Sequence, residues 1–463
     1  MKIKLLITLC LCISFMSFIT LHGENRYKAI YSGIPLFDQN NKEVNAHGAC
    51  IVKEGNKYYL FGEYHTDNSN AFTGFSCYSS SNLTDWKFEK IVLPLQTDGL
   101  LGPDRIGERV KVMRCPATGE YVMFMHTDNL KYSDPHVGYA TCKTINGNYE
   151  FKGELLHNGK YLKKWDLGTF QENDGKGYLL THEGFIYELA SDYKSVNRIV
   201  VSEAIHGGEA PAMFKKNGTY FWLFSDKTSW ERNDNYYLTA QSIKGPWIKR
   251  GFFAPKGSLT WNSQSTFVLP IVYGNDTLHL YMGDRWSFPK QGSAATYVWQ
   301  PISICGDEIS IPAFRESWQM DKSMPGWSAI DIKRKSIKEK CIVEQGIWKA
   351  INGCQKSKEK GAIISYSFKG KQIGIKALSG KTSGYARISI KNDKNKEIIN
   401  SIIDFYSKYE YSSQKFLSPI LKSGNYTLSI EVLGEHPAWS DKRKADYGST
   451  DNYVMIEDVY TID

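Results

Sequence analysis

Four side chains that can take part in acid–base or hydrogen-bonding chemistry stand at matching places in a repeated sequence pattern. They are Glu108, Asp166, Glu209 and Gln264. Each begins a segment made of a strand-like stretch, a Gly/Asn/Asp turn and a second strand rich in aromatic or apolar residues. A further segment of this kind begins at His47-Gly48. If the segments are structurally equivalent, their first residues converge on one place, and three of these residues are carboxylates.

Carboxylates that are brought together repel one another, which raises the pKa of at least one of them. A carboxylic acid that is still protonated near neutral pH can donate its proton to a leaving group. The hydrolysis of glycosidic bonds needs such an acid, and a second group that activates water or attacks the sugar. Calcium binding is the alternative use of clustered acids, but no Asp/Asn-rich ligand loop accompanies them. We therefore expect a catalytic pocket without a metal.

The elements that must position these residues are five β-hairpins. Their sequences are HGACIVKEGNKYYLFGEY, ERVKVMRCPATGEYVMFMHTD, DLGTFQENDGKGYLLTHE, EAPAMFKKNGTYFWLFSD and QSTFVLPIVYGNDTLHLYMGD. Their turns contain residues that tolerate a positive φ, and their flanks are rich in Val, Ile, Tyr, Phe and Trp. Hardly any segment between residues 25 and 315 shows helical periodicity. The pattern predicts an all-β chain with a five-bladed β-propeller over residues 24–316 and one four-stranded sheet per blade.

The start of the chain is typical of an export signal, because Lys2 and Lys4 precede an apolar run from Leu5 to Leu21. We expect a signal peptide over residues 1–23 and a secreted or periplasmic protein, with an uncleaved membrane anchor as the alternative. No later segment is long and apolar enough to span a bilayer, so no membrane contact is expected after signal removal. The formal net charge is +8, but no basic block indicates nucleic-acid binding. No Cys/His cluster indicates zinc, and no cofactor is expected.

The composition changes near residue 317. The stretch 317–340 contains Pro, Gly and many Lys, and it is predicted to be a linker. Over residues 341–463 apolar residues alternate with polar ones, which predicts strands with one buried face and hence a β-sandwich. It resembles the galactose-binding-like sandwiches attached to many glycan-degrading enzymes, so carbohydrate binding and a purely structural role both stay open. The aromatic residues that could bind sugar there are Trp348, Tyr406, Tyr409 and Trp439.

The ordered motifs of the first 300 residues resemble glycoside hydrolase family 43, whose catalytic domain is a five-bladed propeller with inverting chemistry. The resembling stretches are NAHGACIVKEGNKYYLFGEY, FSCYSSSNLTDWKFE, GERVKVM, GGEAPAMFKKNGTYF, SQSTFVLP and YMGDRW. Together they are most similar to the branch that contains exo-β-1,3-galactanases. The resemblance implies that Glu209 is the general acid and that Asp166 tunes its pKa and orients it. It implies that Glu108 binds hydroxyls of the terminal sugar.

One position departs from the family pattern. Most members place an Asp general base in the first blade, and that place falls on Gly48, which cannot be a base. The galactanase branch shares this loss, and the resemblance implies that Gln264 holds the water there. Simple hydrogen bonding of Gln264 to the substrate is the alternative. His47 could hydrogen-bond in the channel or be structural. Further candidates for sugar hydroxyls or a stacking floor are Asp128, Tyr132, Trp165, Trp230 and Trp261.

The leading expectation is an inverting exo-acting glycoside hydrolase that releases galactose from β-1,3-galactan, such as the backbone of arabinogalactan. The partner is then a polysaccharide or oligosaccharide substrate. The same fold could instead carry α-L-arabinofuranosidase, β-xylosidase or galactofuranosidase activity. A propeller that binds glycan without cleaving it is a further alternative, which Gly48 favours and which the presence of Glu209 and Asp166 opposes.

Overall fold

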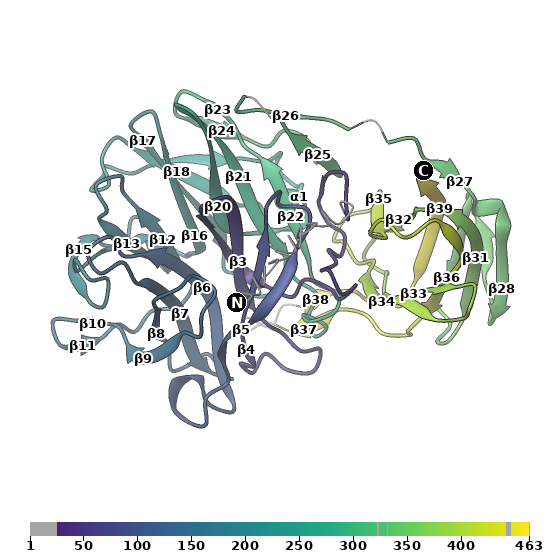
Figure 1. The fold of residues 1–463 in the computed structure, drawn as a ribbon, viewed down its shortest axis with the longest axis horizontal. Helices are drawn as coiled ribbons and strands as arrows, with labels where there is room; N and C mark the ends of the chain where they lie inside the picture. Colours follow the sequence, from purple (N-terminus) through teal and green to yellow (C-terminus); the bar gives the residue numbers. More distant parts are fainter. Residues whose placement is uncertain (1–25, 322–323, 331, 441–445, 463) are drawn as a thin grey trace, which may run out of the picture.

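The computed structural model describes residues 26–321, 324–330, 332–440 and 446–462, so the predicted signal peptide lies outside the described residues. The described chain is built from strands and loops with very little helix, and it forms two lobes side by side, a larger N-terminal one and a smaller C-terminal one (Figure 1). No helix among the described residues is long and apolar enough to cross a membrane. In the described part of the chain the one α-helix, α1, is Leu259–Asn262, and the 3-10 turns η1, η2 and η3 are Gly99–Leu101, His182–Gly184 and Lys338–Lys340.

Three sheets of the larger lobe are four-stranded antiparallel meanders. Sheet one runs β2-β3-β4-β5, with bounds His47–Glu54, Lys57–Glu63, Gly74–Ser80 and Lys87–Pro94. Sheet two runs β6-β7-β8-β9, with bounds Arg105–Arg114, Tyr121–Asn129, His136–Cys142 and Glu150–Glu154. Sheet four runs β16-β17-β18-β19, with bounds Gly208–Lys216, Thr219–Asp226, Tyr236–Ala240 and Ile248–Phe252.

The third and fifth sheets differ from the expected four strands. Sheet three contains β12 to β15, with bounds Leu167–Gln171, Gly177–Thr181, Phe185–Leu189 and Val196–Val201. A small hairpin extends it, because β10 pairs in parallel with β15; β10 and β11 are Leu156–His157 and Lys160–Tyr161. Sheet five has only β20, β21 and β22, with bounds Gln264–Tyr273, Asp276–Arg285 and Thr296–Pro301. The chain after it forms a separate hairpin instead of a fourth strand; β23 and β24 are Ser303–Cys305 and Glu308–Ser310.

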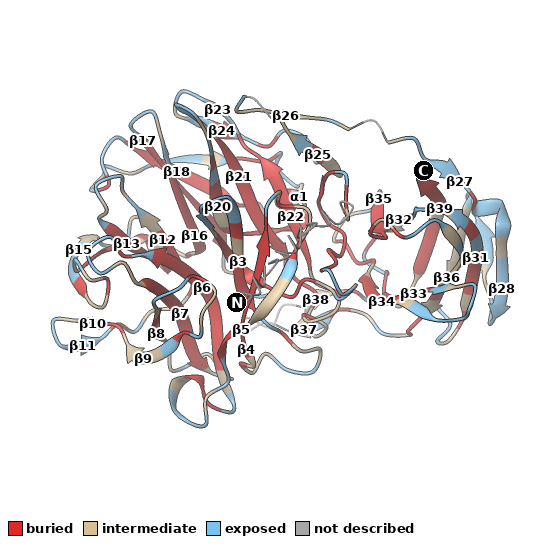
Figure 2. Cartoon of the chain, viewed as in Figure 1, coloured by how far each residue is buried: buried red, intermediate tan, exposed pale blue. Residues whose placement is uncertain are grey.

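The first strand of each sheet contacts the first strand of the next, and the contacts close into a ring from β2 through β6, β12, β16 and β20 back to β2. This closure is that of a five-bladed β-propeller, as the repeated hairpins predicted. The inner strands are the buried ones in Figure 2, while the outer strands such as β15 and β19 are more exposed. The propeller therefore gathers the beginnings of its inner strands around one axis.

The smaller lobe is a β-sandwich of two antiparallel sheets. One sheet runs β29-β30-β39-β32-β35 with β27 also paired to β39; the bounds of β27, β29, β30, β32, β35 and β39 are Lys335–Ser336, Lys349–Ile351, Cys354–Ser357, Gln372–Ser379, Tyr411–Leu417 and Val454–Ile462. The other runs β28-β31-β36-β33-β34, with bounds Cys341–Gln345, Ile363–Gly370, Gly424–Val432, Tyr385–Asn392 and Glu397–Asp404. A separate hairpin consists of β37, Ala438–Ser440, and β38, Asp446–Gly448.

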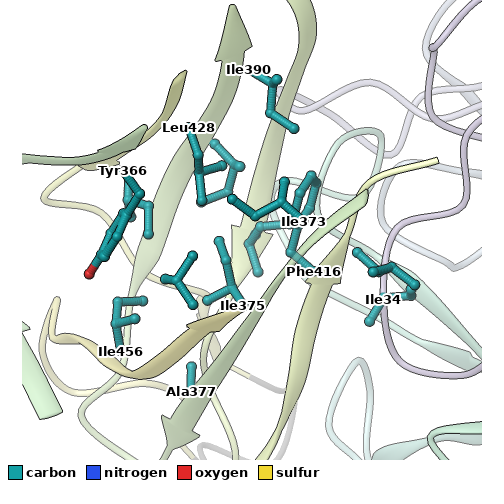
Figure 3. Packing of buried hydrophobic residues seen from close by; sticks show 14 of the residues in the cluster. Ile34, Tyr366, Ile373, Ile375, Ala377, Ile390, Phe416, Leu428 and Ile456 are labelled. Carbon is teal, nitrogen blue, oxygen red and sulfur yellow. The ribbon is translucent and has the colours of Figure 1, made fainter. Parts of the chain in front are cut away.

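The core of the sandwich forms where alternating Ile, Leu and aromatic side chains of the two sheets meet, as Figure 3 shows for Tyr366, Ile375 and Leu428. The N-terminal segment of the propeller lobe also enters this core, because Ile34 and Phe37 belong to the same buried cluster. Part of the segment predicted as a linker is likewise built into the propeller side. In that part β25, Ser317–Met320, pairs with β1, Ile30–Tyr31, and with β26, Trp327–Ser328.

Candidate active site

A cavity of about 690 Å³ opens at the centre of the propeller, and this volume falls in the usual range of small-molecule sites. It is lined by four carboxylates or amides predicted from the sequence, which are Glu108, Asp166, Glu209 and Gln264. The other predicted residues on its wall are Asp128, Tyr132, Trp165 and Trp230. The remaining wall consists of Glu63, Asn70, Arg109, His126, Pro135, Lys227, Ser229, Trp286, Phe288 and Trp439. The structure therefore brings the four predicted polar residues together.

A shared irregularity of the inner strands aims these side chains. The pairing register shifts between His47 and Cys50, between Glu108 and Lys111, and between Glu209 and Ala212. Such β-bulges re-aim side chains and are common next to active sites. Residues inside or beside the bulges have positive φ; they are Gly48 at 59°, Arg109 at 55° and Ala210 at 54°. Because the bulge breaks strict alternation, adjacent residues such as Glu108 and Arg109 both line the pocket.

Glu209 is the pocket group best placed to act as an acid. Burial raises the pKa of its carboxyl well above the usual value, and the negative charge of Asp166 raises it further. Arg109 and Lys227 oppose this rise in the pKa of Glu209 but do not cancel it. The Nε2 of Gln264 donates a hydrogen bond to Oε1 of Glu209 at 3.0 Å. The raised pKa favours the protonated form of Glu209, the form in which a carboxyl can give a proton to a leaving group.

Asp166 is held in place by two donors. The Nε of Arg109 donates to its Oδ1 at 2.9 Å, and the backbone N of Ala210 donates to its Oδ2 at 2.8 Å. The second bond ties Asp166 to the residue that follows Glu209 in the chain, so the two acids are fixed relative to each other. Arg109 also donates to Oε1 of Gln264. One buried guanidinium therefore connects Asp166 and Gln264.

Every hydrogen-bonding position of the Gln264 amide is used. Its Oε1 accepts from Arg109 and from Nε1 of Trp286 at 2.8 Å. Its Nε2 donates to Glu209 and to Oγ of Ser225 at 2.9 Å. A side-chain amide has two donors and two lone pairs on oxygen. To hold a water molecule, Gln264 must therefore exchange one of these bonds when substrate enters.

Glu63, which sequence reasoning missed, takes the space that a side chain at position 48 would fill. A Cβ added at Gly48 would lie 1.8 Å from Oε1 of Glu63. The two strands pair so that His47 stands opposite Glu63. The backbone N of Arg109 donates to Oε1 of Glu63 at 2.7 Å, and Nε2 of His65 lies 2.6 Å from Oε2. The signal in the sequence is the glycine itself, because a missing side chain leaves room for one from the neighbouring strand.

The electrostatic surroundings keep Glu63 ionised. Burial alone would raise the pKa of its carboxyl, but the hydrogen bond and charge of His65 and the charge of Arg109 lower it by more. The net pKa of Glu63 is therefore lowered, in contrast to that of Glu209. Two carboxyl groups of one pocket thus have pKa values that are pushed in opposite directions, which is the pattern of an acid and a base.

A second polar group lies on the wall formed by β6 and β7. The hydroxyl of Tyr132 donates to Oε1 of Glu108 at 2.6 Å. The ring of His126 lies between two carboxylates, 3.5 Å from Glu108 and 3.3 Å from Asp128. Burial lowers the pKa of His126, but hydrogen bonds to Asp128 and Glu108 raise it to about 9. His126 is therefore a cation between the predicted sugar-binding residues, and it was missed because the sequence does not show that its ring lies between Glu108 and Asp128.

Aromatic rings line the rest of the pocket. Trp165 stacks on His182 with ring centroids 3.3 Å apart, and Trp230 lies 5.1 Å from Trp286. The C-terminal lobe supplies Trp439, which was one of several open candidates, and its ring lies 6.5 Å from that of Phe288. Aromatic faces of this kind provide broad apolar surface for a ligand.

Two predicted residues lie outside the pocket wall. His47 is buried beneath it, where its Nδ1 lies 3.2 Å from Asp284 and its ring stacks on Tyr297 with centroids 4.6 Å apart. Trp261 turns away from the axis, donates from Nε1 to the backbone O of Ile311 at 3.0 Å, and packs against a propeller core cluster. Direct sugar contact by His47 and Trp261 is therefore not supported by their positions.

Comparison with known proteins matches this chain to glycoside hydrolases. Residues 43–250 match the family model described as glycosyl hydrolases family 43. The chain is similar to a solved candidate exo-β-1,3-galactanase from Bifidobacterium bifidum s17, with 35% sequence identity and a TM-score of 0.57 over 63% of this chain and 97% of that one. It has the fold of a variant of the exo-β-1,3-galactanase from Phanerochaete chrysosporium solved with β-1,3-galactotriose, at 24% identity and a TM-score of 0.68 over 94% of this chain and 100% of that one. A β-D-galactofuranosidase from Aspergillus niger is 28% identical over 250 residues, which are 51% of this chain and 68% of that protein.

Proposed function

The chain belongs to glycosyl hydrolases family 43, and on this premise we propose that it is an inverting, exo-acting enzyme that releases galactose from β-1,3-galactan. That it is a glycoside hydrolase follows from the family; the sugar, the linkage and the stereochemistry are the proposal. The observation that carries it is the partly buried Glu209, whose pKa is raised, beside Asp166 in a pocket of sugar-sized volume. The choice of galactan rests on the similarity to the Bifidobacterium bifidum protein.

The proposed reaction assigns one step to each group. The proton of Glu209 passes to the glycosidic oxygen while the bond between that oxygen and C1 of the sugar breaks. Water attacks C1 from the opposite face and loses its proton to a base or to solvent. Asp166 keeps the pKa of Glu209 high before the proton is transferred. Its carboxylate also accepts a hydrogen bond from Arg109, which holds that guanidinium in place. The carboxylates of Glu108 and Asp128 accept hydrogen bonds from sugar hydroxyls. The hydroxyl of Tyr132 can donate to a sugar oxygen or accept from a sugar hydroxyl.

Two residues are candidates for handling the water. Gln264 is the candidate from the family resemblance, and its amide contacts Glu209 directly. Glu63 is the second candidate, because its ionised carboxylate fills the space of the residue-48 side chain. An activated substrate such as 4-nitrophenyl β-galactoside separates the two, since its leaving group needs no acid. Gln264→Ala and Glu63→Gln are each assayed on galactan and on this substrate. The residue that acts on water is the one whose replacement removes turnover of both.

The substrate proposal is tested by incubating the protein with β-1,3-galactan, arabinan and xylan and identifying the released monosaccharide. Galactose from galactan alone supports the proposal. Release of galactofuranose from a galactofuranoside, which the similarity to the Aspergillus niger enzyme makes the second candidate, would replace it. Retention on a galactan column without any release would instead favour a glycan-binding propeller. We also propose export through residues 1–23, which the N-terminal sequence of the protein recovered from the producing cells tests.

A further inference from the structure

The two segments that line the pocket with Trp230 and Trp286 also contact the C-terminal sandwich. Glu231 follows Trp230 and is buried, and its Oε2 accepts a hydrogen bond from the hydroxyl of Tyr406 at 2.7 Å. Ser287 follows Trp286 and is likewise buried. The sandwich therefore contacts these two segments at residues next to those that line the pocket.

Asp404, the last residue of β34, contacts both segments. Its Oδ2 accepts a hydrogen bond from Oγ of Ser287 at 2.9 Å and lies 3.6 Å from the guanidinium of Arg232. Burial raises the pKa of Asp404, while the charges of Arg232 and Lys415 oppose that rise. A second sandwich residue, Tyr385, donates from its hydroxyl to the backbone O of Ser287 at 3.1 Å.

Arg232 links Asp404 to Trp286, which lines the pocket. Its Nη2 donates to the backbone O of Trp286 at 2.7 Å, and its side chain is only 3% exposed. A buried charge needs partners, and those of Arg232 are Glu231 at 3.6 Å, Asp404 at 3.6 Å and the ring of Tyr406 at 5.1 Å. Two of these three partners belong to the sandwich. The residue that holds the backbone of Trp286 is therefore itself held by a carboxylate and a ring that the second lobe supplies.

Trp286 in turn fixes the amide at the centre of the site. Its Nε1 donates to Oε1 of Gln264, and Nε2 of Gln264 donates to Glu209. We propose that Asp404 of the C-terminal sandwich is a positioning residue for Gln264, acting through Arg232, Ser287 and Trp286. The inference rests on the proposed function, because it gives Gln264 a part in the reaction. It makes the sandwich part of the catalytic machinery and not a detachable module.

The test is the full chain carrying Asp404→Asn, which keeps the shape of the side chain and removes the charge near Arg232. We expect the kcat for β-1,3-galactotriose to fall by about tenfold or more, with KM changed by less than about twofold, because small misplacements of reacting groups cost rate. Hydrogen–deuterium exchange of the peptide around residues 283–290 should increase. The matched control is Glu316→Gln, which changes a carboxylate that accepts from the backbone N of Gln414 at 2.7 Å, away from the pocket. It should leave both kcat and exchange unchanged.

A double-mutant cycle separates positioning from general weakening. Trp286→Phe removes the indole donor to Gln264, so adding Asp404→Asn to it should lower kcat by less than about twofold more. Losses that simply multiply in the double variant, or an Asp404→Asn enzyme with unchanged kcat and exchange, would overturn the inference. Should Asp404→Asn not fold, Ser287→Ala removes one of the same contacts and is put through the same cycle. If the wild-type protein releases no galactose, the proposed function fails, whereas the exchange experiment still reports on the contact.

Discussion

At the scale of single residues, the pocket shifts the pKa values of its carboxyl groups in opposite directions. Burial and the charge of Asp166 raise the pKa of Glu209, while His65 and Arg109 lower that of Glu63. One side chain therefore carries a proton at the pH where another has lost its own. Such divergence identifies acid and base roles better than the mere presence of acids does.

The link between Asp166 and Glu209 gives a pH prediction. Asp166→Asn removes a negative charge that raises the pKa of Glu209, so Glu209 loses its proton at lower pH. The activity, which falls as pH rises through the pKa of Glu209, should therefore begin to fall at lower pH in the variant. The measurement is kcat/KM against pH for galactotriose, with kcat also expected to drop by about tenfold or more.

Glu120→Gln serves as the control for this profile. Glu120 pairs with Lys194 at 2.7 Å, outside the pocket wall, and its loss should leave the profile where it is. A basic limb that stays in place, or moves to higher pH, in Asp166→Asn would contradict the role given to Asp166.

The convergence of Glu108, Asp166, Glu209 and Gln264 was predictable because each begins the same element of a repeat, and equivalent elements of a propeller share an axis. Arg109 was not predictable, since alternation in a regular strand would point it away from Glu108. Trp439 was only one candidate among several, because its place depends on how two lobes pack. His47 and Trp261 were left open between the pocket and a structural role, and they lie outside the pocket wall because adjacency in sequence does not fix direction at a bulge or turn.

At the scale of elements, the bulges at the start of the inner strands convert a regular sheet into a site. Gly48 illustrates this, because its φ of 59° favours glycine and its missing side chain admits Glu63. Sequence patterns located the hairpins but not these bulges, which alter pairing without altering the apolar pattern. The extra hairpin on the third sheet and the missing strand of the fifth also follow from pairing that the repeat did not encode.

Gly48→Ala tests the use of this space. The new Cβ would meet the carboxylate of Glu63, so we expect Glu63 to be displaced and kcat to fall by about tenfold or more. Placing alanine at positive φ should also lower the free energy of unfolding by about 1–2 kcal/mol. Urea unfolding and galactotriose kinetics measure the two effects separately.

Gly55→Ala is a closely matched control. Gly55 also has a φ of 59°, but a Cβ there would have no atom within 4 Å. Its stability loss should reflect the positive φ alone and not exceed that of Gly48→Ala, while its activity stays at the wild-type level. Equal activity in the two variants would show that the position of Glu63 is unimportant.

At the scale of the whole molecule, the two lobes are joined through more than one part of the chain. Residues near the N-terminus pack into the core of the C-terminal sandwich; they include Phe37 and Ile34, of which Figure 3 labels Ile34. Glu231 and Arg232 of the propeller find buried partners in the same lobe. The all-β class and both architectures could be predicted from periodicity, but this interlocking could not, because the contacts join residues hundreds of positions apart.

A chain that ends at Asp321 should therefore not behave as an independent enzyme. It would expose the apolar N-terminal segment and leave Arg232 without Asp404 and Tyr406, which destabilises the propeller. We expect a low soluble yield, a lower melting temperature and little activity, measured against the full chain by thermal unfolding and galactose release. A truncated protein that melts and turns over like the full chain would show that the lobes are independent.

The central claim is that Glu209 donates the proton that cleaves a galactan chain, and the release of galactose from β-1,3-galactotriose by wild-type protein and by Glu209→Gln tests it most directly. Glutamine keeps the size of the side chain, so the variant should fold with an unchanged circular dichroism spectrum. The account predicts galactose as the first monosaccharide from the wild type, and a rate lower by about 100-fold or more in the variant. A folded variant that releases galactose at the wild-type rate would contradict it.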